Sequence, residues 1–548
     1  MRMAYSLAPF APVTGLRGMV SAADHLASTA GTGLLARGGS AADAAVGAAA
    51  VMAVTSPYLC GMGGDMLAVV SAPGADPIAL LATGRAGSGV DAEKLRAEGH
   101  SIMPVRGDFR TVPVPGAVDG WLALHARYGR LSLAEVFSPA VELAQEGFVA
   151  SLMLSLASHL VARVPGAQEL CPNGPLPLEA HVRLPSMART LRSIVDDGRD
   201  GFYGGEFGRN LVDLGQGVFD KDDLAQNLAQ WCTPSRLRVW GHDLWTVPAP
   251  SQGYLTLASS WIAERVGLGS DPSDPLWAHL IIEASRAAGH DRPAVLYDGA
   301  DGQFLLNEER LAAAADRIRT DRAAPSDVAR GAPADPSADI PRVGDGDTTH
   351  LCAVDGDGLG VSLTQSNALD FGSHLVAGST GIFLHNRGVG FSLVPGHPAE
   401  LAPRTRPPHT LSPMLATTPD GALAHVIGAM GGDAQPQILQ QILARMVHAG
   451  EDPATAVAAA RVSLVAPGAG PFRLWWGDDL GVCVEGHAPT AWIEGLKDRG
   501  HRVIPIVAFE PNAVGGAQII SVVPGEGGAR HLVGAADPRS PCAATASL

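Results

Sequence analysis

One hydroxyl side chain, Thr348, lies at the junction between a long polar segment and a predicted β-strand. Residues Thr320 to Asp347 are mostly Ala, Asp, Pro, Arg and Gly, so we expect an exposed, flexible connector there. If the chain cleaved itself before Thr348, the freed α-amine would have an ordinary pKa of about 7.7–8.0 and would be substantially neutral at working pH. That amine would serve as the base for the hydroxyl of its own residue. Thr348 and Thr349 are also ordinary β-forming residues at a strand start, and this simpler interpretation stays open.

A pair of glycines, Gly431 and Gly432, lies between a predicted strand at residues 424–428 and a predicted amphipathic helix at residues 437–449. Backbone N–H groups at a turn that leads into a helix are suited to stabilise a developing negative charge. The pair is therefore a candidate oxyanion hole, and the alternative is a turn with no catalytic role.

The surrounding chain indicates both helices and strands. A hairpin is predicted from strands at residues 351–355 and 359–364, with the first strand beginning at Thr348. A helix at residues 33–37 ends at Gly38-Gly39, and Ser40 to Asp43 resembles a capping box that starts a second helix. Further predictions are a strand at 66–71, helices at 133–147, 276–287, 310–319 and 491–499, and short strands between about 474 and 533. We therefore expect a mixed fold whose first half is rich in helices.

Short motifs occur in a specific order along nearly the whole chain. They are Gly38-Gly39, Asp43-Ala44-Ala45, Pro250-Ser251-Gln252-Gly253, Asp347-Thr348-Thr349-His350, residues 372–381, Phe391-Ser392, Arg406-Pro407, Ser412-Pro413, Gly431-Gly432 and Ala536-Asp537-Pro538-Arg539. No single motif is specific, but the ordered set resembles the γ-glutamyltransferases, a family of N-terminal-nucleophile hydrolases.

The resemblance implies an α+β fold, a four-layer αββα sandwich, made as a precursor that cleaves itself. Residues 1–347 would form a large subunit and residues 348–548 a small subunit, intertwined in one domain. Thr348 would attack the carbonyl of Asp347 and then the substrate amide, and the acyl-enzyme would pass its acyl group to water or an amine. Ser366 falls where the family places a second hydroxyl beside the nucleophile, and Gly431 and Gly432 fall at the oxyanion hole. We expect no metal and no organic cofactor, because the chain supplies the nucleophile, the base and the oxyanion donors.

Departures from the family pattern concern substrate recognition. Thr83 falls where well-studied members have a carboxylate-binding arginine, and Gly390 falls where they have an amine-binding acid. His409-Thr410 replaces a Ser-Ser pair. The nearest candidates for substrate binding are Arg85, Arg387, His409, Thr410 and Asp433. Ordinary alternatives are a surface arginine, a core histidine and an acid at a helix start. If the pocket is otherwise conventional, introducing Asp at Gly390 and Arg at Thr83 is expected to improve turnover of γ-glutamyl compounds.

Three functions follow from these residues. The first is hydrolysis or transfer of γ-glutamyl groups from glutathione-like amides. The second is an acylase or specialised hydrolase that uses the same threonine on a non-γ-glutamyl substrate in secondary metabolism. The third is an uncleaved binding protein without catalysis. The presence of Thr348, Ser366 and the glycine pair argues against the third.

Composition excludes several other classes of protein. The chain has 548 residues, of which 46% are hydrophobic and 17% charged, so it has enough apolar material for a large core. Its formal charge of −16 disfavours nucleic acid and anionic membranes as partners. We expect a cytoplasmic protein whose partners are a small amide or γ-glutamyl substrate and its own two subunits. The six cysteines are far apart and suggest neither a zinc site nor a disulfide framework.

Overall fold

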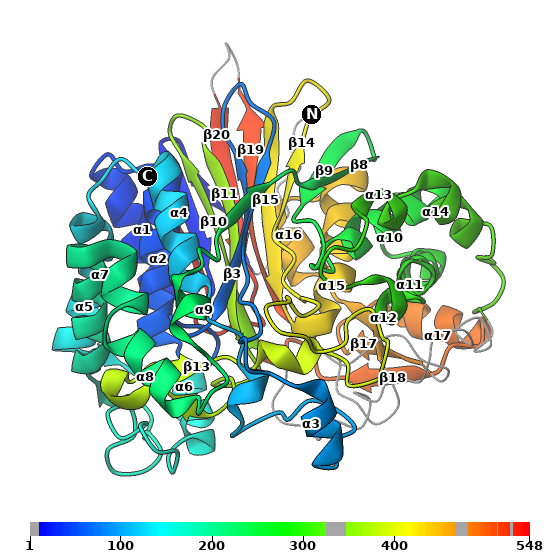
Figure 1. Ribbon diagram of the computed structural model, residues 1–548. Helices are drawn as coiled ribbons and strands as arrows, with labels where there is room; N and C mark the ends of the chain where they lie inside the picture. Colours follow the sequence, from blue (N-terminus) through cyan, green and yellow to red (C-terminus); the bar gives the residue numbers. More distant parts are fainter. Residues whose placement is uncertain (1–9, 325–346, 466–479, 512, 526–529) are drawn as a thin grey trace.

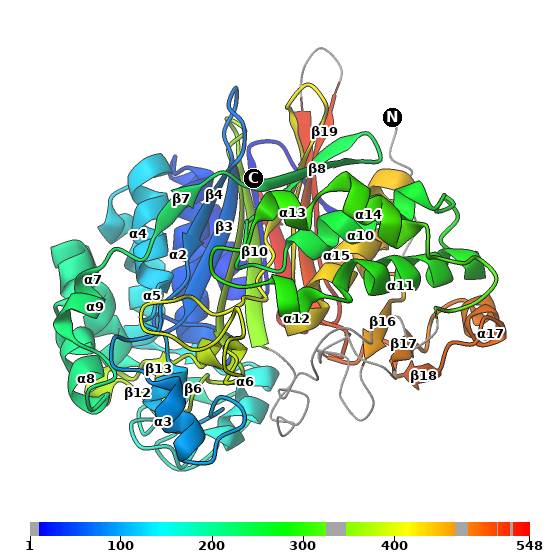
Figure 2. The ribbon, with the colours of Figure 1, turned by 45° about the vertical axis from the view of Figure 1, so that its right-hand side comes forward.

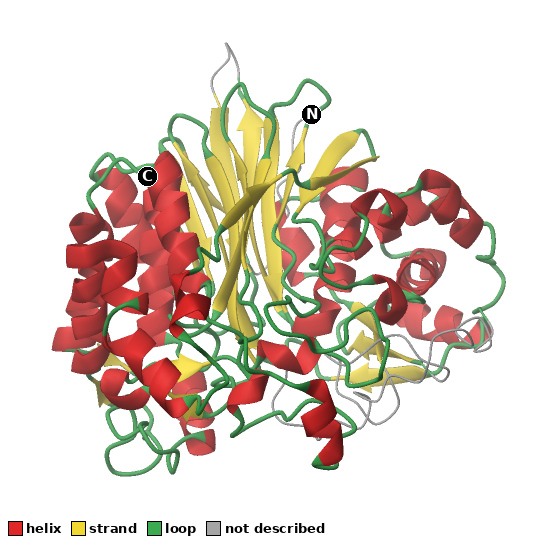
Figure 3. Cartoon of the chain, in the orientation of Figure 1, coloured by secondary structure: helices red, strands yellow, loops and turns green. Residues whose placement is uncertain are grey.

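Two β-sheets stacked face to face form the centre of the molecule, as a computed structural model shows (Figure 1). The structure describes residues 10–324, 347–465, 480–511, 513–525 and 530–548. Helices cover the outer face of each sheet, so the order of layers is helix, sheet, sheet, helix (Figure 3). The predicted four-layer αββα sandwich, an α+β fold, is therefore confirmed. Within the described residues, no helix has both the length and the apolar character needed to cross a bilayer.

Among the described residues, each central sheet has seven strands, and neighbouring strands are antiparallel. The first sheet has the strand order β21 (Ala544–Ser547), β2 (Gly18–Ala22), β10 (Asp347–Asp355), β11 (Gly360–Ala368), β3 (Asp65–Ser71), β4 (Ile78–Ala82) and β7 (Gln230–Cys232). The second has the order β1 (Val13–Gly15), β20 (Arg530–Ala536), β19 (Gly516–Pro524), β15 (Leu423–Met430), β14 (Met414–Thr417), β9 (His242–Thr246) and β8 (Ser235–Val239). Smaller sheets pair β5 (Phe148–Val149) with β6 (His181–Val182), β12 (Leu375–Val376) with β13 (Phe383–Leu384), and β16 (Val462–Val465) with β17 (Gly481–Glu485) and β18 (Val503–Ile506).

The two helical layers differ in where their residues come from. The layer on the first sheet comes from the N-terminal half: α1 (His25–Ala36), α2 (Ala41–Thr55), α4 (Ala117–Tyr128), α5 (Leu133–Glu146) and α7 (Pro185–Tyr203). The layer on the second sheet contains α10 (Tyr254–Arg265), α11 (Pro275–Gly289), α14 (Glu308–Ala315), α15 (Gln435–Leu443), α16 (Pro453–Ala458) and α17 (Thr490–Asp498), seen from the side in Figure 2. The other α-helices of the described residues are α3 (Ala92–Ala97), α6 (Leu152–Ala157), α8 (Glu206–Leu214), α9 (Lys221–Ala225), α12 (Arg292–Val295) and α13 (Gly302–Leu305).

Helix α2 shows how the sequence determines this packing. Every residue from Ala41 to Thr55 is buried, because the helix lies among α1, α4, α5 and the strands of the first sheet. A helix that is buried on all sides is apolar on all sides, which explains its alanine-rich sequence. Its start is the predicted capping box: the Ser40 side chain accepts from the Asp43 N–H, and the Asp43 carboxylate accepts from the Ser40 N–H.

Strand alternation sorts the residues of β10 between two environments. Leu351 and Ala353 belong to the core beneath the helices, whereas Cys352 and Val354 belong to the core between the sheets. His350 lies on the same side as Cys352, since its ring approaches Gly428 of the second sheet. The residue two positions earlier is Thr348, at the end of this row, next to a register irregularity between Asp347 and Thr349.

Both sheets contain strands from before and from after residue 347. Strand β10 pairs with β2 and β11 pairs with β3, while β14 pairs with β9 in the other sheet. Separating the two parts would therefore break both sheets. Of the predicted connector at Thr320 to Asp347, residues 325–346 lie outside the described residues.

Substituting Gly428 by alanine should destabilise the contact between the sheets. A Cβ at this position would lie 2.1 Å from Cε1 of His350, and that ring is held by Thr364 at 2.9 Å and by Cys352 at 3.2 Å. We expect a loss of about 1–3 kcal/mol, seen as a lower midpoint of thermal or urea unfolding.

The control is Gly33→Ala at an exposed position of helix α1, where nothing lies within 4 Å of the added Cβ and little change or a slight gain is expected. The double variant Gly428→Ala with His350→Ala should lose less than the sum of the single losses. Additive losses would contradict the proposed steric conflict.

Candidate active site

Thr348 and Ser366 form a hydroxyl pair at the end of the β10–β11 hairpin. The Thr348 hydroxyl donates to the Ser366 Oγ at 3.2 Å, and both residues are buried. The N–H of Ala368 donates to the same Oγ at 2.8 Å, which fixes the position of the serine oxygen. The sequence-based pairing of these two residues is thus present in the structure.

A buried carboxylate, Asp65, lies next to this pair. Asp65 begins β3 and is the register partner of Ser366 on β11. Its Oδ2 atom lies 2.7 Å from His409 Nε2, 2.9 Å from Arg387 Nε and 3.4 Å from His385 Nδ1. One carboxylate oxygen therefore gathers three basic side chains from the segment between β13 and β14.

The charge states in this group follow from burial and pairing. Burial alone would raise the pKa of the Asp65 carboxyl, but Arg387, His409 and His385 outweigh it and hold this pKa well below its ordinary value. Burial lowers the pKa of His409 to about 4, so its imidazole is neutral near pH 7. The Leu411 N–H donates to His409 Nδ1 at 3.3 Å, which leaves the ring proton on Nε2, where it bonds to Asp65. Both nitrogens of His409 are thus engaged within the protein.

Arg387 is fixed on one side and available on the other. Its Nε binds Asp65 and its Nη1 donates to the Thr410 hydroxyl at 3.0 Å. Its Nη2 is buried and, among the described residues, has no hydrogen-bond partner. A buried guanidinium N–H group without an acceptor is costly, which makes Nη2 a candidate donor to a bound anion.

The glycine pair forms the turn between β15 and helix α15. Gly431 has φ of +136° and Gly432 has φ of +52°, a region of backbone conformation that favours glycine. The side-chain amide of Gln252 donates to the carbonyl of Gly432 and to that of Thr410, each at 3.1 Å. Gln252 thereby ties the glycine turn to the segment that holds Arg387.

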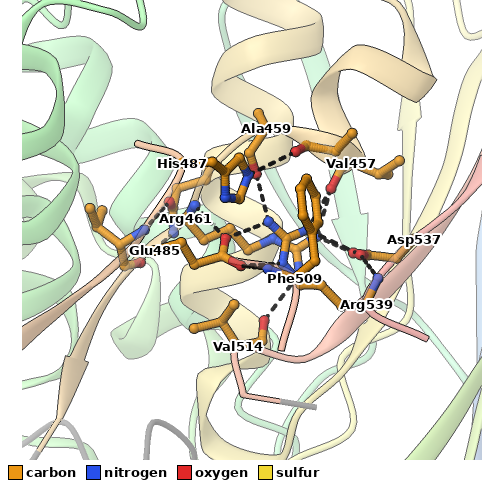
Figure 4. A network of polar contacts seen from close by, with 12 residues as sticks. Val457, Ala459, Arg461, Glu485, His487, Phe509, Val514, Asp537 and Arg539 are labelled. Atoms are coloured by element: carbon orange, nitrogen blue, oxygen red, sulfur yellow. Dashed lines mark hydrogen bonds and ion pairs between the residues drawn. The ribbon is translucent and has the colours of Figure 1, made fainter. Parts of the chain in front are cut away.

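A buried charge network supports the strand end before this turn (Figure 4). Arg461 binds the Asp537 carboxylate and donates to the carbonyls of Val514 and Gly515. Gly515 is packed against the carbonyl of Met430, only 2.2 Å from where a Cβ would stand. Arg539 links Asp537 to Glu485. The Ala-Asp-Pro-Arg motif therefore has a structural role: through Arg461 it holds the backbone that packs against the end of β15, just before the glycine turn.

The remaining predicted residues have other partners. The Arg85 guanidinium binds Asp298 at 3.4 Å and the carbonyl of Arg404 at 3.0 Å, and its side chain is 30% exposed. It matches the surface-arginine alternative, and the structure does not bring it into the group around Asp65. Asp433 pairs with Arg292 at 3.3 Å. The backbone of Asp347 belongs to β10, and its side chain lies outside the described residues.

The surroundings of Thr83 and Gly390 show what a side chain of the usual family type would meet at each position. Thr83 is buried, and its hydroxyl has no hydrogen-bond partner among the described residues. A Cβ at Gly390 would lie 2.7 Å from the carbonyl of Pro408, so an aspartate there requires the backbone to move. The predicted gain in γ-glutamyl turnover from Asp at Gly390 and Arg at Thr83 therefore depends on such a backbone shift, and it stays a prediction.

Comparison with known proteins identifies the family. The family model described as gamma-glutamyltranspeptidase matches residues 27–547. The chain belongs to the γ-glutamyltranspeptidase family. It is 33% identical to the glutathione hydrolase-like YwrD proenzyme of Bacillus subtilis, over 97% of this chain and 99% of that protein. It is 35% identical to the oxamate amidohydrolase proenzyme of Klebsiella pneumoniae, over 95% of this chain and 97% of that protein.

Solved structures of γ-glutamyltranspeptidase relatives share the fold. The crystal structure of cephalosporin acylase from Bacillus halodurans superposes with a TM-score of 0.87 at 28% identity, covering 100% of this chain and 99% of that one. As a γ-glutamyltranspeptidase family member, the chain is an N-terminal-nucleophile enzyme, a self-cleaving amide hydrolase or acyltransferase. Its relatives include both glutathione hydrolase-like proteins and acylases or amidohydrolases, so membership alone does not select the acyl group.

Asp65→Asn should destabilise the site strongly. The amide cannot balance the buried charge of Arg387, so we expect a loss of about 3–5 kcal/mol in the free energy of unfolding. Asp357→Asn makes the same change in the exposed pair with Arg130 and should cost under about 1 kcal/mol. Urea unfolding of both variants at pH 7 measures the difference.

The pH dependence of this pair follows from its depressed pKa. The stabilisation by ionised Asp65 is present above the unfolded value of about 3.9 and is lost only as pH falls through the lower folded-state pKa. Lowering the pH from 7 to 5 should therefore not reproduce the effect of Asp65→Asn at this pair.

Equal losses of unfolding free energy in the two aspartate variants would count against the central role of Asp65.

Proposed function

We propose that the chain cleaves itself between Asp347 and Thr348, and that Thr348 then hydrolyses a small amide whose acyl group carries a carboxylate. The observation that carries the substrate class is the guanidinium of Arg387, fixed by Asp65 and Thr410, whose buried Nη2 has no hydrogen-bond partner in the part of the chain that the structure describes. The nucleophile assignment is supported by the Thr348–Ser366 pair and by family membership.

Self-cleavage uses the hydroxyl of Thr348 on its own preceding peptide. Oγ1 attacks the carbonyl carbon of Asp347, the C–N bond to Thr348 breaks, and the nitrogen takes a proton to become an α-amine. The resulting ester between Asp347 and Oγ1 is hydrolysed by water, which leaves a carboxylate on Asp347. Ser366 accepts the Oγ1 hydrogen bond and so orients the hydroxyl before attack.

The same hydroxyl then acts on the substrate. The α-amine of Thr348 takes the proton from Oγ1 as Oγ1 attacks the amide carbonyl, and that proton goes to the leaving amine. The backbone N–H groups of Gly431 and Gly432 would stabilise the oxyanion. Water or an acceptor amine resolves the acyl-enzyme ester.

Carboxylate recognition by Arg387 separates this proposal from the γ-glutamyl alternative. A γ-glutamyl group carries an amine as well as a carboxylate, and in this chain Gly390 stands where the amine-binding acid is expected. Hydrogen bonds to charged groups contribute about 1.5–3 kcal/mol each, so losing the contact to the amine would weaken γ-glutamyl recognition by about one to two orders of magnitude. One relative is named an oxamate amidohydrolase, and oxamate is an amide with a carboxylate on the amide carbon.

The γ-glutamyl activity remains the second candidate, favoured by the 33% identity to a glutathione hydrolase-like proenzyme. A panel of oxamate, a γ-glutamyl anilide, glutathione and a neutral primary amide separates the two. The proposal expects higher kcat/KM for oxamate than for the γ-glutamyl compounds. Efficient turnover of glutathione with a micromolar KM, and none of oxamate, would favour the alternative.

Thr348→Ala should remain a single full-length chain, whereas the wild type should give fragments of residues 1–347 and 348–548. The reason is that alanine lacks the attacking oxygen. Denaturing electrophoresis and intact-mass measurement check this. Thr349→Ala is the matched control and should still cleave, since the Thr349 hydroxyl contacts the Gln365 carbonyl at 3.4 Å and the Cys60 thiol, and neither belongs to the hydroxyl pair. An active, folded wild type that stays uncleaved would overturn the nucleophile assignment.

Arg387→Lys should raise KM for oxamate by about 10–100-fold, because lysine lacks the second donor arm that is free to bind a carboxylate. Turnover of a neutral primary amide should fall much less. This difference would distinguish a lost carboxylate contact from a general disturbance of the side chains around Asp65, which would affect both substrates. Arg85→Lys provides the control and should leave both substrates unaffected. An equal loss on charged and neutral amides would show that Arg387 does not recognise the carboxylate.

A further inference from the structure

Two histidines and a glutamate meet inside the outer helical layer. His279 and Glu283 lie one turn apart on α11, and His501 precedes β18. His279 Nδ1 is 2.8 Å from His501 Nε2, which is 4.0 Å from Glu283 Oε1. The three candidate ligand atoms all lie within 4.8 Å of one another. All three residues are buried, with exposed fractions of 0%, 1% and 6% for His279, Glu283 and His501.

The atoms around this cluster orient two of the side chains. His279 Nε2 donates to the carbonyl of Arg319 at 2.6 Å, so the Nδ1 lone pair faces the other two residues. The N–H of Ala324 donates to Glu283 Oε2 at 3.0 Å. Metal-binding histidines commonly donate their second N–H to a carbonyl in this way, and metal-binding carboxylates are commonly hydrogen-bonded too.

Two other polar atoms of the cluster lack hydrogen bonds within the described residues. Glu283 Oε1 and His501 Nδ1 are buried and, within the described part of the chain, have no hydrogen-bond partner. The Nε of Arg286 lies 3.4 Å from Glu283 Oε1, an ion-pair distance without a hydrogen bond. A buried carboxylate oxygen that lies beside two imidazoles and, within the described residues, accepts no hydrogen bond is available to a cation.

We propose that His279, Glu283 and His501 bind a zinc ion. Two imidazole nitrogens and one carboxylate oxygen are a common ligand set for zinc, with water as the fourth ligand. Bonds of about 2.0–2.2 Å in tetrahedral geometry place ligand atoms about 3.3 Å apart. Small side-chain rotations therefore suffice: the two nitrogens separate slightly, and Glu283 Oε1 moves toward the ion and away from Arg286.

The position of the site gives it a structural role. Helices α11 and α17 pack together in the outer helical layer that covers the second sheet, near the edge of the molecule (Figure 2). His279 and Glu283 precede Thr348 in the sequence, whereas His501 follows it. After the proposed cleavage the ion would join the two subunits; this consequence alone rests on the proposed function, and zinc binding itself does not.

Zinc titration of the full chain tests the site directly. Protein stripped with a chelator is titrated with Zn²⁺ by calorimetry, and with Co²⁺ by visible absorption, which reports tetrahedral coordination. We expect one ion per chain and a higher thermal midpoint with zinc. Glu283→Gln and His501→Gln should each weaken zinc binding at least tenfold. Glutamine at position 283 keeps an acceptor for the Ala324 N–H, so this variant should fold.

The matched control is His290→Gln at the C-terminal end of α11, where the His290 ring bonds to the carbonyl of Ala287. It should bind zinc as the wild type does. Uncleaved Thr348→Ala should also bind zinc, so failure of the cleavage proposal and failure of the metal site are distinguishable. No zinc uptake by the wild type, or unchanged affinity in both Glu283→Gln and His501→Gln, would overturn the proposal.

Discussion

The ion pair between Asp65 and Arg387 is the interaction on which the active region depends. The two residues are 322 positions apart in the sequence and meet where both are almost fully buried. Removing two charges from water is expensive, and a well-packed apolar pair is often at least as stable. The pair is therefore better understood as a device for holding a guanidinium in one orientation. His409 and Thr410 complete that device, since each contacts one of the two partners.

The interleaved sheets explain how a chain of this kind tolerates a break in its backbone. Residue 347 separates the strands of each sheet into two sets, but hydrogen bonds between neighbouring strands join the sets repeatedly. A cut at the start of β10 removes one covalent bond and leaves these ladders intact. The new amine would form at the end of a strand held on both sides, by β2 and by β11.

Local sequence signals predicted the elements well because they depend on neighbouring residues. The capping box at Ser40, the hairpin after Thr348 and the glycine turn at Gly431 are all determined within a few positions. The family resemblance supplied the four-layer arrangement, which periodicity alone did not. Helix α15 ends earlier than predicted, at Leu443, and continues as a π-helix over Ala444–His448.

Contacts between distant segments were the part that the sequence did not predict. Arg85 was predicted as a substrate ligand because its ion pair with Asp298, 213 residues away in the sequence, cannot be seen from local patterns. Asp65 was missed, although an acid directly before an apolar strand is a signal that a buried charge needs a partner. The histidine and glutamate cluster was missed because His279 and His501 are 222 residues apart and only the fold brings them together.

The close approach of Gly390 to the carbonyl of Pro408 also has an evolutionary consequence. Any side chain at this position is accepted only after the neighbouring Pro407-Pro408 backbone has shifted. A substitution at Gly390 therefore depends on how readily this neighbouring backbone can move. During divergence, the identity of residue 390 and the path of residues 407–408 should therefore change together.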